Sequence, residues 1–359
     1  MKILLDIGHP AHVHYLKNLA LEMQKRGHEF LFTTRKKEVT EDLLKKYNLN
    51  YISFGPSYKS KFGKIFGLLR FSYLMMVVSI RFKPDILING TFYSAFVSWL
   101  LNKHHISMED TGNMEQVALY RPFTNVILTS SSFHKDLGIK QIRYNSYHEL
   151  AYLNPKYYTA DDNIYHDLGI SKNQNYVVLR FISWNASHDV GQSGLDFALK
   201  INLVKFLENK YRVFISSESA LPEEFQKYKL TVGPEKIHDV LFFASLYIGE
   251  GATMASECAM LGTPAVYVNS MEAGTIDEQE KYGLLFHFRN SSGVFEKVCE
   301  LSFMENLKDE WKRRKQRMIE EKINLTDFLV WFVENYPESK TIMNENPDYQ
   351  QIFNIKAST

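Results

Sequence analysis

The sequence predicts an α/β fold with two doubly wound, parallel-sheet domains, and three observations support this class. Apolar, strand-like runs alternate with segments of helical periodicity in both halves of the chain. Residues 249–269, GEGATMASECAMLGTPAVYVN, together with the apolar run before them, predict a strand–turn–helix–strand unit. A length of 359 residues exceeds what one hydrophobic core usually organises, so two domains are expected.

The first half is expected to form one domain, residues 1–150, in which strands and helices alternate. Its strands are predicted at 2–7, 29–33, 51–54, 85–89, 106–109 and 125–129. Helical periodicity covers 13–26, 39–47 and 94–102, and Gly27 ends the first of these helices. This alternation is typical of a parallel sheet covered by helices on both faces.

The second half repeats the pattern after residues 144–162, which are rich in Tyr, Asn and Asp and suit an interdomain linker. The second domain, 151–335, is predicted to contain strands at 175–181 and 212–216, a helix at 194–209 and the unit around residue 249. A charged helix from about 307 and an amphipathic one at 325–335 close it. The polar tail, 336–359, is a separate segment, and its return to the first domain is one alternative.

The strand–turn–helix–strand unit is the strongest indication of a ligand site. Two glycines flank Glu250 at the end of a buried strand, and a helix is predicted to begin at Ala252 or Thr253. Free backbone N–H groups and the positive end of the helix dipole at such a start favour a phosphate or diphosphate. Glu257, about one turn further, is placed to accept hydrogen bonds from ribose hydroxyls. The alternative is an ordinary crossover whose glycines only tighten a turn.

Composition narrows the function classes. A net charge of +1 leaves no excess of Lys and Arg for bulk nucleic-acid binding. The two cysteines, Cys258 and Cys299, cannot build a disulfide framework and lack metal-ligand spacing. Residues 1–7 do not resemble a signal peptide, and no uninterrupted apolar stretch of about 18 residues is present. A soluble, cytoplasmic protein is therefore expected.

The loop after the first strand carries His9, His12 and His14 at two-residue steps. Without acidic or thiolate ligands in the same loop these imidazoles make a weak metal site, so no metal is expected. A histidine at the carboxyl edge of a parallel sheet is suited to remove a proton from an acceptor hydroxyl, because its pKa lies near neutrality. A packing role is the alternative for each of the three.

Residues 56–83 combine basic and aromatic side chains in a stretch with amphipathic character. One interpretation is a helix that rests on an anionic membrane surface, at the inner face of the membrane, and admits a lipid-linked acceptor. The other is a core helix with a solvated flank. Both interpretations stay open at the level of sequence.

Three stretches resemble a bacterial and archaeal family of predicted glycosyltransferases over nearly the whole chain. They are DIGHPAHVHYLKNLALEMQKRGHEF at the start, YNSYHELAYLNP at the domain junction and the segment 249–269. That family is related to the lipid II-forming N-acetylglucosaminyltransferase and to the non-hydrolysing UDP-N-acetylglucosamine 2-epimerases. The resemblance implies the GT-B architecture, in which two Rossmann-like domains face a central cleft.

The resemblance also implies a nucleotide-sugar site in the second domain. Residues 251–253 match positions that bind the diphosphate, Glu257 the position that holds the ribose, and Ile237 the position that meets the uracil ring. Arg180 and Ser183 match a loop that contacts the phosphates, although Arg180 is alternatively a structural ion-pair residue. The matched residues are Arg180, Ser183, Ile237, Gly251, Ala252, Thr253 and Glu257.

In the first domain the resemblance implies three candidates for acid–base chemistry. His12 matches the histidine of the glycine-rich loop in the lipid II-forming enzyme, and Glu109 matches a catalytic glutamate of the epimerases. Asp110 is an alternative base, and either carboxylate could instead cap the following helix. The epimerases also use an aspartate at the loop matching residues 89–91 and a histidine at the loop matching 180–184. This chain has neither, which disfavours epimerisation.

The expected function is transfer of a sugar from a nucleotide-sugar, UDP-linked, to a glycan or lipid-linked acceptor in cell-envelope or surface polysaccharide synthesis. Metal-independent inversion by direct displacement is the expected mechanism, with no cofactor beyond the donor substrate. A 2-epimerase or nucleotide-sugar hydrolase on the same fold is the alternative. A third class is a non-catalytic nucleotide-sugar-binding protein, which would need no base.

Overall fold

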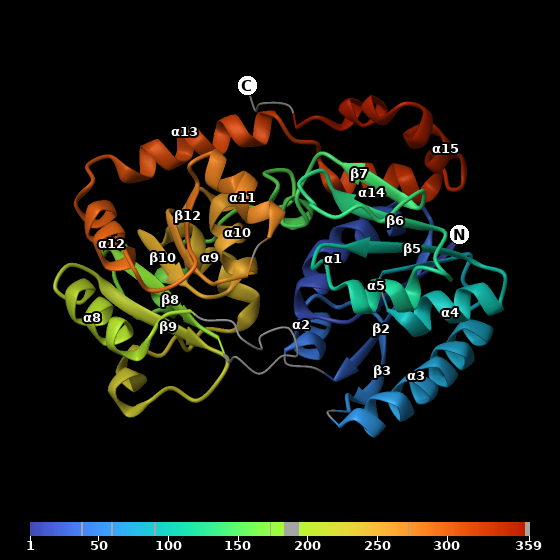
Figure 1. The fold of residues 1–359 in the computed structure, drawn as a ribbon, viewed down its shortest axis with the longest axis horizontal. Coiled ribbons are helices and arrows are strands. Elements are labelled where there is room, and N and C mark those ends of the chain that lie inside the picture. Colours follow the sequence, from blue (N-terminus) through green and yellow to red (C-terminus); the bar gives the residue numbers. More distant parts are fainter. Residues whose placement is uncertain are drawn as a thin grey trace. The chain divides into compact units, whose positions relative to one another are not determined.

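The computed structural model describes all residues except 37–38, 59, 90, 173, 183–193, 272 and 356–359. The chain divides into two compact units. Unit 1 comprises Met1–Tyr157 together with Lys322–Thr359, and unit 2 comprises Tyr158–Glu321. Each unit is built on its own parallel sheet with helices packed around it (Figure 1).

The sheet of unit 1 has seven strands. They are β1 (Lys2–Ile7), β2 (Glu29–Lys36), β3 (Tyr51–Pro56), β4 (Ile86–Ile88), β5 (His104–Glu109), β6 (Val126–Ser130) and β7 (Gln141–Tyr144). Their order is β3-β2-β1-β4-β5-β6-β7, and every neighbouring pair is parallel. The strand order reverses at β1, which lies between β2 and β4. Such switch points, at the carboxyl ends of the strands, are where doubly wound sheets bind ligands.

The helices of unit 1 connect these strands and continue after the chain returns from unit 2. They are α1 (Pro10–Lys25), α2 (Thr40–Lys46), α3 (Lys61–Phe82), α4 (Phe92–Leu100), α5 (Met114–Tyr120), α6 (Leu150–Leu153), α14 (Leu325–Glu334), α15 (Glu338–Glu345) and the 3₁₀-helix η3 (Pro347–Phe353). Helix α1 contacts α2, α6 and α14, while α4 contacts both α3 and α5. Helix α1 begins three residues before the predicted 13–26 because Pro10 occupies its first turn and His9 caps it.

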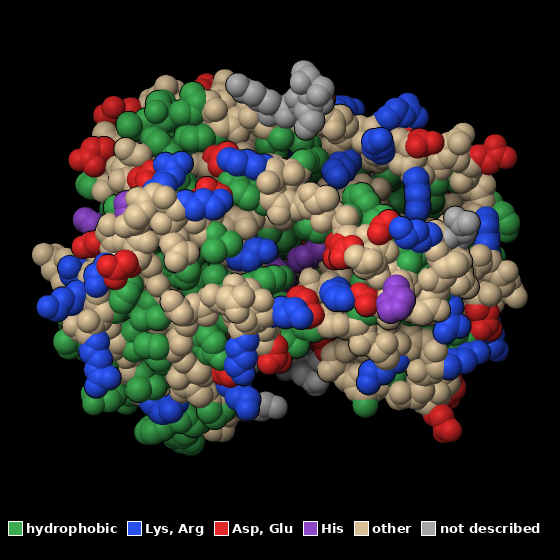
Figure 2. All heavy atoms as spheres, turned by 180° about the vertical axis from the view of Figure 1, so that it is seen from behind, with side chains coloured by type: hydrophobic (Ala, Val, Ile, Leu, Met, Phe, Trp, Pro, Cys, Tyr) green, Lys and Arg blue, Asp and Glu red, His purple; other side chains and the backbone are tan. Residues whose placement is uncertain are grey.

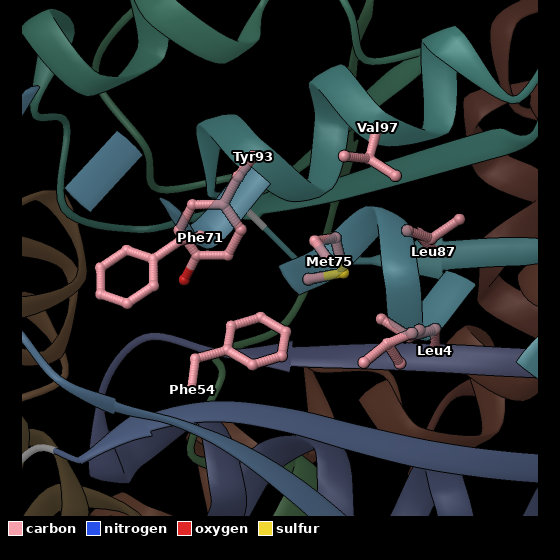
Figure 3. Packing of buried hydrophobic residues seen from close by; sticks show 8 residues of the cluster. Leu4, Phe54, Phe71, Met75, Leu87, Tyr93 and Val97 are labelled. Atoms are coloured by element: carbon pink, nitrogen blue, oxygen red, sulfur yellow. The ribbon is translucent and has the colours of Figure 1, made fainter. Parts of the chain in front are cut away.

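One hydrophobic cluster fixes α3 and α4 to the sheet of unit 1 (Figure 3). Its members are Leu4, Phe54, Phe71, Met75, Val78, Leu87, Tyr93 and Val97. The side chain of Leu4 meets those of the helices from the centre of β1, and burial of the three aromatic rings supplies much of the apolar area. The inner face of α3 is therefore part of the folded core.

The sheet of unit 2 has five strands. They are β8 (Tyr176–Phe181), β9 (Arg212–Ser217), β10 (Leu246–Gly249), β11 (Ala265–Val268) and β12 (Leu285–Phe288). The order is β12-β11-β10-β8-β9, all parallel, so this sheet switches direction at β8, between β9 and β10. The helices are α7 (Ile164–Asp167), α8 (Phe197–Leu207), α9 (Ile237–Phe243), α10 (Ala252–Leu261), α11 (Gly274–Lys281), α12 (Val294–Phe303) and α13 (Leu307–Glu320), with 3₁₀-helices η1 (Glu223–Tyr228) and η2 (Pro234–Lys236).

The unit boundaries differ from the predicted domains 1–150, 151–335 and 336–359. Residues 144–157, expected as part of a linker, include the end of β7 and all of α6 and belong to unit 1. The helix at 325–335, expected in the second domain, is α14 of unit 1, where its apolar side packs against α1 and the Thr326 hydroxyl donates to the carbonyl of Ala151 at 2.8 Å. The return to unit 1 therefore begins at Lys322 and includes the tail from 336. An amphipathic helix does not reveal from its sequence which sheet it will cover.

Candidate functional site

The switch point of unit 1 brings together the loops that follow β1 and β4. His12 Nδ1 accepts a hydrogen bond from the backbone N–H of Gly8 at 3.2 Å and lies 2.6 Å from Asn89 Nδ2. The Asn89 amide also donates to the carbonyl of Asp6 and accepts from the hydroxyl of Tyr15. Because a backbone N–H can only donate, a neutral His12 carries its proton on Nε2. In this tautomer His12 Nε2 carries a hydrogen and is a hydrogen-bond donor. For Nε2 to act as a base, the proton would have to lie on Nδ1, and the hydrogen bond from Gly8 would be lost.

A second histidine, which the sequence analysis did not select, lies at the same edge. His148 Nδ1 is 3.1 Å from Asp110 Oδ2, directly after β5. The His148 side chain is 8% exposed, whereas that of Asp110 is 51% exposed. Burial opposes the charged form of both groups, but their hydrogen bond and opposite charge hold the pKa of Asp110 at about 2 and raise the pKa of His148. Asp110 is thus an accessible carboxylate whose orientation is set by a buried imidazole.

Aromatic rings connect His12 to this pair. The ring centroids of His12 and Tyr15 are 5.3 Å apart, those of Tyr15 and His148 are 4.7 Å apart, and those of His148 and Tyr144 are 6.1 Å apart. Within the described part of the chain, His148 Nε2 is buried without a hydrogen-bond partner. The structure therefore brings His12 and Asp110, two of the predicted candidates, into one polar site lined by packed rings.

Glu109, the third predicted candidate, is saturated by its own loop. Its Oε1 accepts hydrogen bonds from the N–H and hydroxyl of Thr111 and from the N–H of Gly112, at 2.8 to 3.0 Å. Its Oε2 accepts from the hydroxyl of Tyr120 at 2.7 Å. Burial raises the pKa of Glu109. These contacts tie Glu109 to the loop before α5 and to Tyr120 at the end of that helix, whereas the cap of α5 is Asn113. The Glu109 carboxylate therefore already has protein partners in place of a substrate.

The other two histidines of the loop after β1 make structural contacts. His9 Nδ1 caps α1 by accepting from the N–H of Ala11 at 3.2 Å. His14 packs its ring against Tyr47 and Tyr152. Among the described residues, no group of three or more His, Cys, Asp or Glu side chains is arranged to hold a metal ion.

The switch point of unit 2 is formed by the ends of β8 and β10. Gly249 is required there, because a Cβ atom would lie 2.5 Å from the hydroxyl oxygen of Tyr247 and 2.7 Å from Arg180 Cβ. Helix α10 begins at Ala252 with Gly251 as its N-cap, which confirms the predicted helix start. No side chain of the N-cap satisfies the first N–H groups, and Thr253 is exposed beside them. In the described part of the chain no hydrogen bond from a side chain caps this helix start, and such a start favours an anionic group.

Glu250, between the two glycines, is fully buried and was not selected from the sequence. Its carboxylate accepts hydrogen bonds from the N–H groups of Ile182 at 3.1 Å and Leu195 at 2.9 Å, and from Lys200 Nζ at 3.2 Å. Glu250 thereby connects the turn after β10 to the chain on both sides of residues 183–193. Ser183, a predicted phosphate contact, lies outside the described residues.

The remaining candidates in unit 2 already have protein partners. The Arg180 guanidinium donates to Ser216 Oγ and Glu218 Oε1, both at 2.8 Å, so the predicted alternative of a structural ion pair is present. Glu257 is buried on α10, and its Oε1 lies 3.1 Å from Nε2 of His238 on α9. Ile237, half-buried, directly precedes His238 and begins α9. The structure thus places Ile237 and Glu257 on two adjoining helices.

Comparison with known proteins supports the fold. The chain is 26% identical over 291 residues to "Uncharacterized protein MJ0665" of Methanocaldococcus jannaschii, covering 77% of this chain and 84% of that one. A solved UDP-GlcNAc 2-epimerase of the same organism, in complex with UDP-GlcNAc and UDP, is similar at a TM-score of 0.63 and 12% identity, over 88% of this chain and 99% of that one.

A glycosyltransferase has a comparable likeness. SsfS6 of Streptomyces sp. SF2575 is similar at a TM-score of 0.57 and 14% identity, over 93% of this chain and all of that one. These likenesses and the two parallel sheets confirm the predicted fold class, that of GT-B glycosyltransferases and UDP-GlcNAc 2-epimerases. The match of residues 1–338 to the model of the family described as "Protein of unknown function (DUF354)" shows that the chain belongs to that family.

Proposed function

We propose that the protein is a glycosyltransferase that takes a sugar from a UDP-linked donor bound to unit 2. The observation that carries the proposal is the open N-terminus of α10 at the switch point of unit 2, directly after two glycines. The fold is shared with proteins solved with UDP or UDP-GlcNAc, which supports a uridine nucleotide as the ligand.

The donor would be held without a metal ion. The N–H groups of residues 251–253 would bind the diphosphate, where the helix dipole favours negative charge. Glu257 would accept hydrogen bonds from the ribose by exchanging its contact with His238, and Ile237 would pack on the base. Arg180 would leave Glu218 to neutralise the departing diphosphate. Each of these four roles exchanges an existing protein contact or an open N–H group for a ligand contact.

The acceptor chemistry would lie in unit 1. The accessible Asp110 carboxylate is a candidate for the base, because His148 fixes its orientation. The same contact lowers the pKa of Asp110, which keeps it ionised but weakens it as a base, so His12 is the second candidate. The acceptor hydroxyl oxygen would form a bond to the anomeric carbon as the bond to the diphosphate breaks, and Asp110 would take the hydroxyl proton. His12 would donate a hydrogen bond from Nε2, or act as the base after a change of tautomer. The displacement inverts the anomeric configuration.

A 2-epimerase is the second candidate, and the structural likeness to several UDP-GlcNAc 2-epimerases favours it. Asn89 lies in the loop where the resemblance places an acid, and its amide is occupied by Asp6 and Tyr15. Among the described residues that meet at the site of unit 1, Asp110 is the accessible carboxylate, whereas this reaction needs acid and base groups on both faces of the sugar. Hydrolysis of the donor would use the same carboxylate with water as acceptor.

We further propose that the acceptor is a glycan or a lipid-linked sugar of the cell envelope and that the protein acts in the cytoplasm. A non-catalytic nucleotide-sugar-binding protein would retain the unit 2 contacts but would not depend on Asp110.

The test is incubation of the full chain with a panel of UDP-, GDP- and dTDP-sugars, followed by NMR and by ligand-protected melting. If the protein transfers the sugar or slowly hydrolyses the donor, free UDP should appear from one UDP-sugar. The Asp110→Asn variant should lose turnover but keep its nucleotide affinity within a few fold of that of the wild type. His12→Ala is the paired variant. A new sugar epimer in place of free UDP would establish the epimerase, and nucleotide-sugar binding with no product in the wild type would favour the sensor.

A further inference from the structure

Helix α3 exposes one apolar stripe along its length. The residues of the stripe recur at intervals of three, four or seven, which places them on one side of a helix. Their exposed fractions range from 57% to 87%. The stripe consists of Phe62, Ile65, Phe66, Leu69, Tyr73 and Ile80.

The helix packed against α3 exposes further large apolar side chains. Helix α4 packs beside α3 and exposes Trp99 at 58% and Leu100 at 48%. Figure 2 shows hydrophobic side chains with Lys and Arg among them at the lower left, where α3 lies. Single exposed apolar residues are ordinary on protein surfaces, but a contiguous set of large ones marks an interaction site.

The opposite side of α3 is anchored in unit 1. Phe71, Met75 and Val78 belong to the hydrophobic cluster with β1 and β4 (Figure 3). By length and composition alone the window Ile65–Phe82 is apolar enough to cross a membrane, with a mean hydropathy of 1.6, and 28% of it is buried. A helix whose inner face completes the core cannot leave the unit without exposing that core. Its outer stripe is therefore available only as a surface.

The segment of sequence that contains the stripe carries charge of one sign. Between Asp42 and Asp85 the sequence has no acidic residue, and it has eight basic ones: Lys45, Lys46, Lys59, Lys61, Lys64, Arg70, Arg81 and Lys83. At the carboxyl end of α3 both Arg81 and Lys83 are exposed. Pairing of two such stripes in a dimer would bring two segments of like charge together, each without an acidic residue of its own between Asp42 and Asp85. An anionic partner is favoured instead.

We propose that the stripe on α3 is a docking surface for an anionic lipid bilayer. The helix would lie in the plane of the interface, with its aromatic and aliphatic side chains among the lipid headgroups and its basic residues on the anionic phosphates. Aromatic residues such as Phe62, Phe66 and Tyr73 suit this boundary. The surface does not depend on the proposed reaction, and a protein without transferase activity would carry it equally.

The experiment is sedimentation of the full chain with phosphatidylcholine vesicles, with and without phosphatidylglycerol. Binding is expected only to the anionic vesicles, and it should weaken by about tenfold or more at about 0.5 M salt, because surface attraction is screened. Replacing Phe62, Phe66 and Leu69 together with serine should abolish binding without changing the melting temperature, since all three side chains are exposed. The Arg81→Gln/Lys83→Gln variant should weaken binding by about thirtyfold.

The matched control is Ile139→Ser, together with Ile352→Ser, whose side chains are 91% and 63% exposed in unit 1 outside α3. The control variant should bind anionic vesicles as the wild type does. The proposal is overturned if the wild type ignores anionic vesicles at low salt or if the triple serine variant binds them unchanged. It is also overturned if the wild type is a dimer in solution that the triple variant dissociates, because the stripe would then be an interface between copies.

Discussion

Replacing Glu250 with alanine is expected to destabilise unit 2 by about 3 to 5 kcal/mol, the scale of a buried ion pair that loses one partner. The carboxylate is inaccessible to solvent and accepts three hydrogen bonds, two of them from the backbone N–H groups of Ile182 and Leu195. Its third partner, Lys200, is 16% exposed, and the Nζ atom lies 4.5 Å from the ring centroid of Phe181. In the variant, solvent and this ring would therefore still stabilise the Lys200 charge in part. The larger share of the loss therefore falls on the two backbone groups.

The conservative variant Glu250→Gln should lose less, about 1 to 3 kcal/mol, because an amide carbonyl can still accept from one of the three donors. Glu300→Ala is the control, since Glu300 is 61% exposed and its ion pair with Lys297 should contribute less than about 0.5 kcal/mol. The assay is urea denaturation read by hydrogen exchange of peptides from β10 and α10, which isolates unit 2. A loss below about 1 kcal/mol in Glu250→Ala would refute the role assigned to this carboxylate.

Three further predictions concern unit 1. Burial lowers the pKa of His105 to about 3, so below pH 6.5 the unfolded state binds more protons than the folded state. The free energy of unfolding should therefore fall by up to about 1.4 kcal/mol per pH unit as the pH decreases from about 6.5 towards 3. In denaturation curves, the free energy of unfolding of His105→Asn should fall less steeply with pH than that of the wild type. On α3, Phe71→Ala should cost about 3 to 5 kcal/mol and Phe62→Ala less than about 0.5 in thermal denaturation, and equal losses would contradict the assigned faces. The pKa of Asp110 lies below its ordinary 3.8 and that of His148 above 6.5, so their mutual stabilisation is complete from about pH 4 to 6.5. It is lost as pH falls through about 2 or rises through the raised pKa of His148, and a pH-independent difference between wild type and Asp110→Asn would contradict it.

Much of the fold was predictable because its signals are local. The run at 2–7 forms β1, and the helix start after Gly251 was predicted correctly, since apolar periodicity and glycine turns act over a few residues. Strands β7 and β12 were missed, because half-exposed strands at sheet edges lack a continuous apolar run. The tertiary assignment of α14 to unit 1 was missed for a similar reason, since amphipathicity does not specify a partner.

The polar contacts of the sites were less accessible from the sequence. His148 meets Asp110 from 38 residues away, and Glu250 meets Ile182 from 68 residues away. Nothing in the spacing of these residues indicates the contacts, because the sheet topology creates them. Glu109 was selected for its acidic side chain, but its carboxylate is saturated by the loop that follows it.

The proposed function requires a nucleotide diphosphate to bind at the N-terminus of α10. Calorimetric titration of UDP into the wild type and into Gly251→Ala measures this binding. A Cβ atom added at Gly251 would have Arg180 Cγ as its nearest neighbour, at 3.7 Å, and the backbone φ of −94° suits alanine. The Gly251→Ala variant should therefore fold normally. The added Cβ atom would stand where the diphosphate approaches the main chain. Saturable UDP binding to the wild type is expected, and it should be weakened by about tenfold or more in Gly251→Ala at an unchanged melting temperature. Absence of UDP binding to the wild type, or equal affinity in both proteins, would contradict the proposed site.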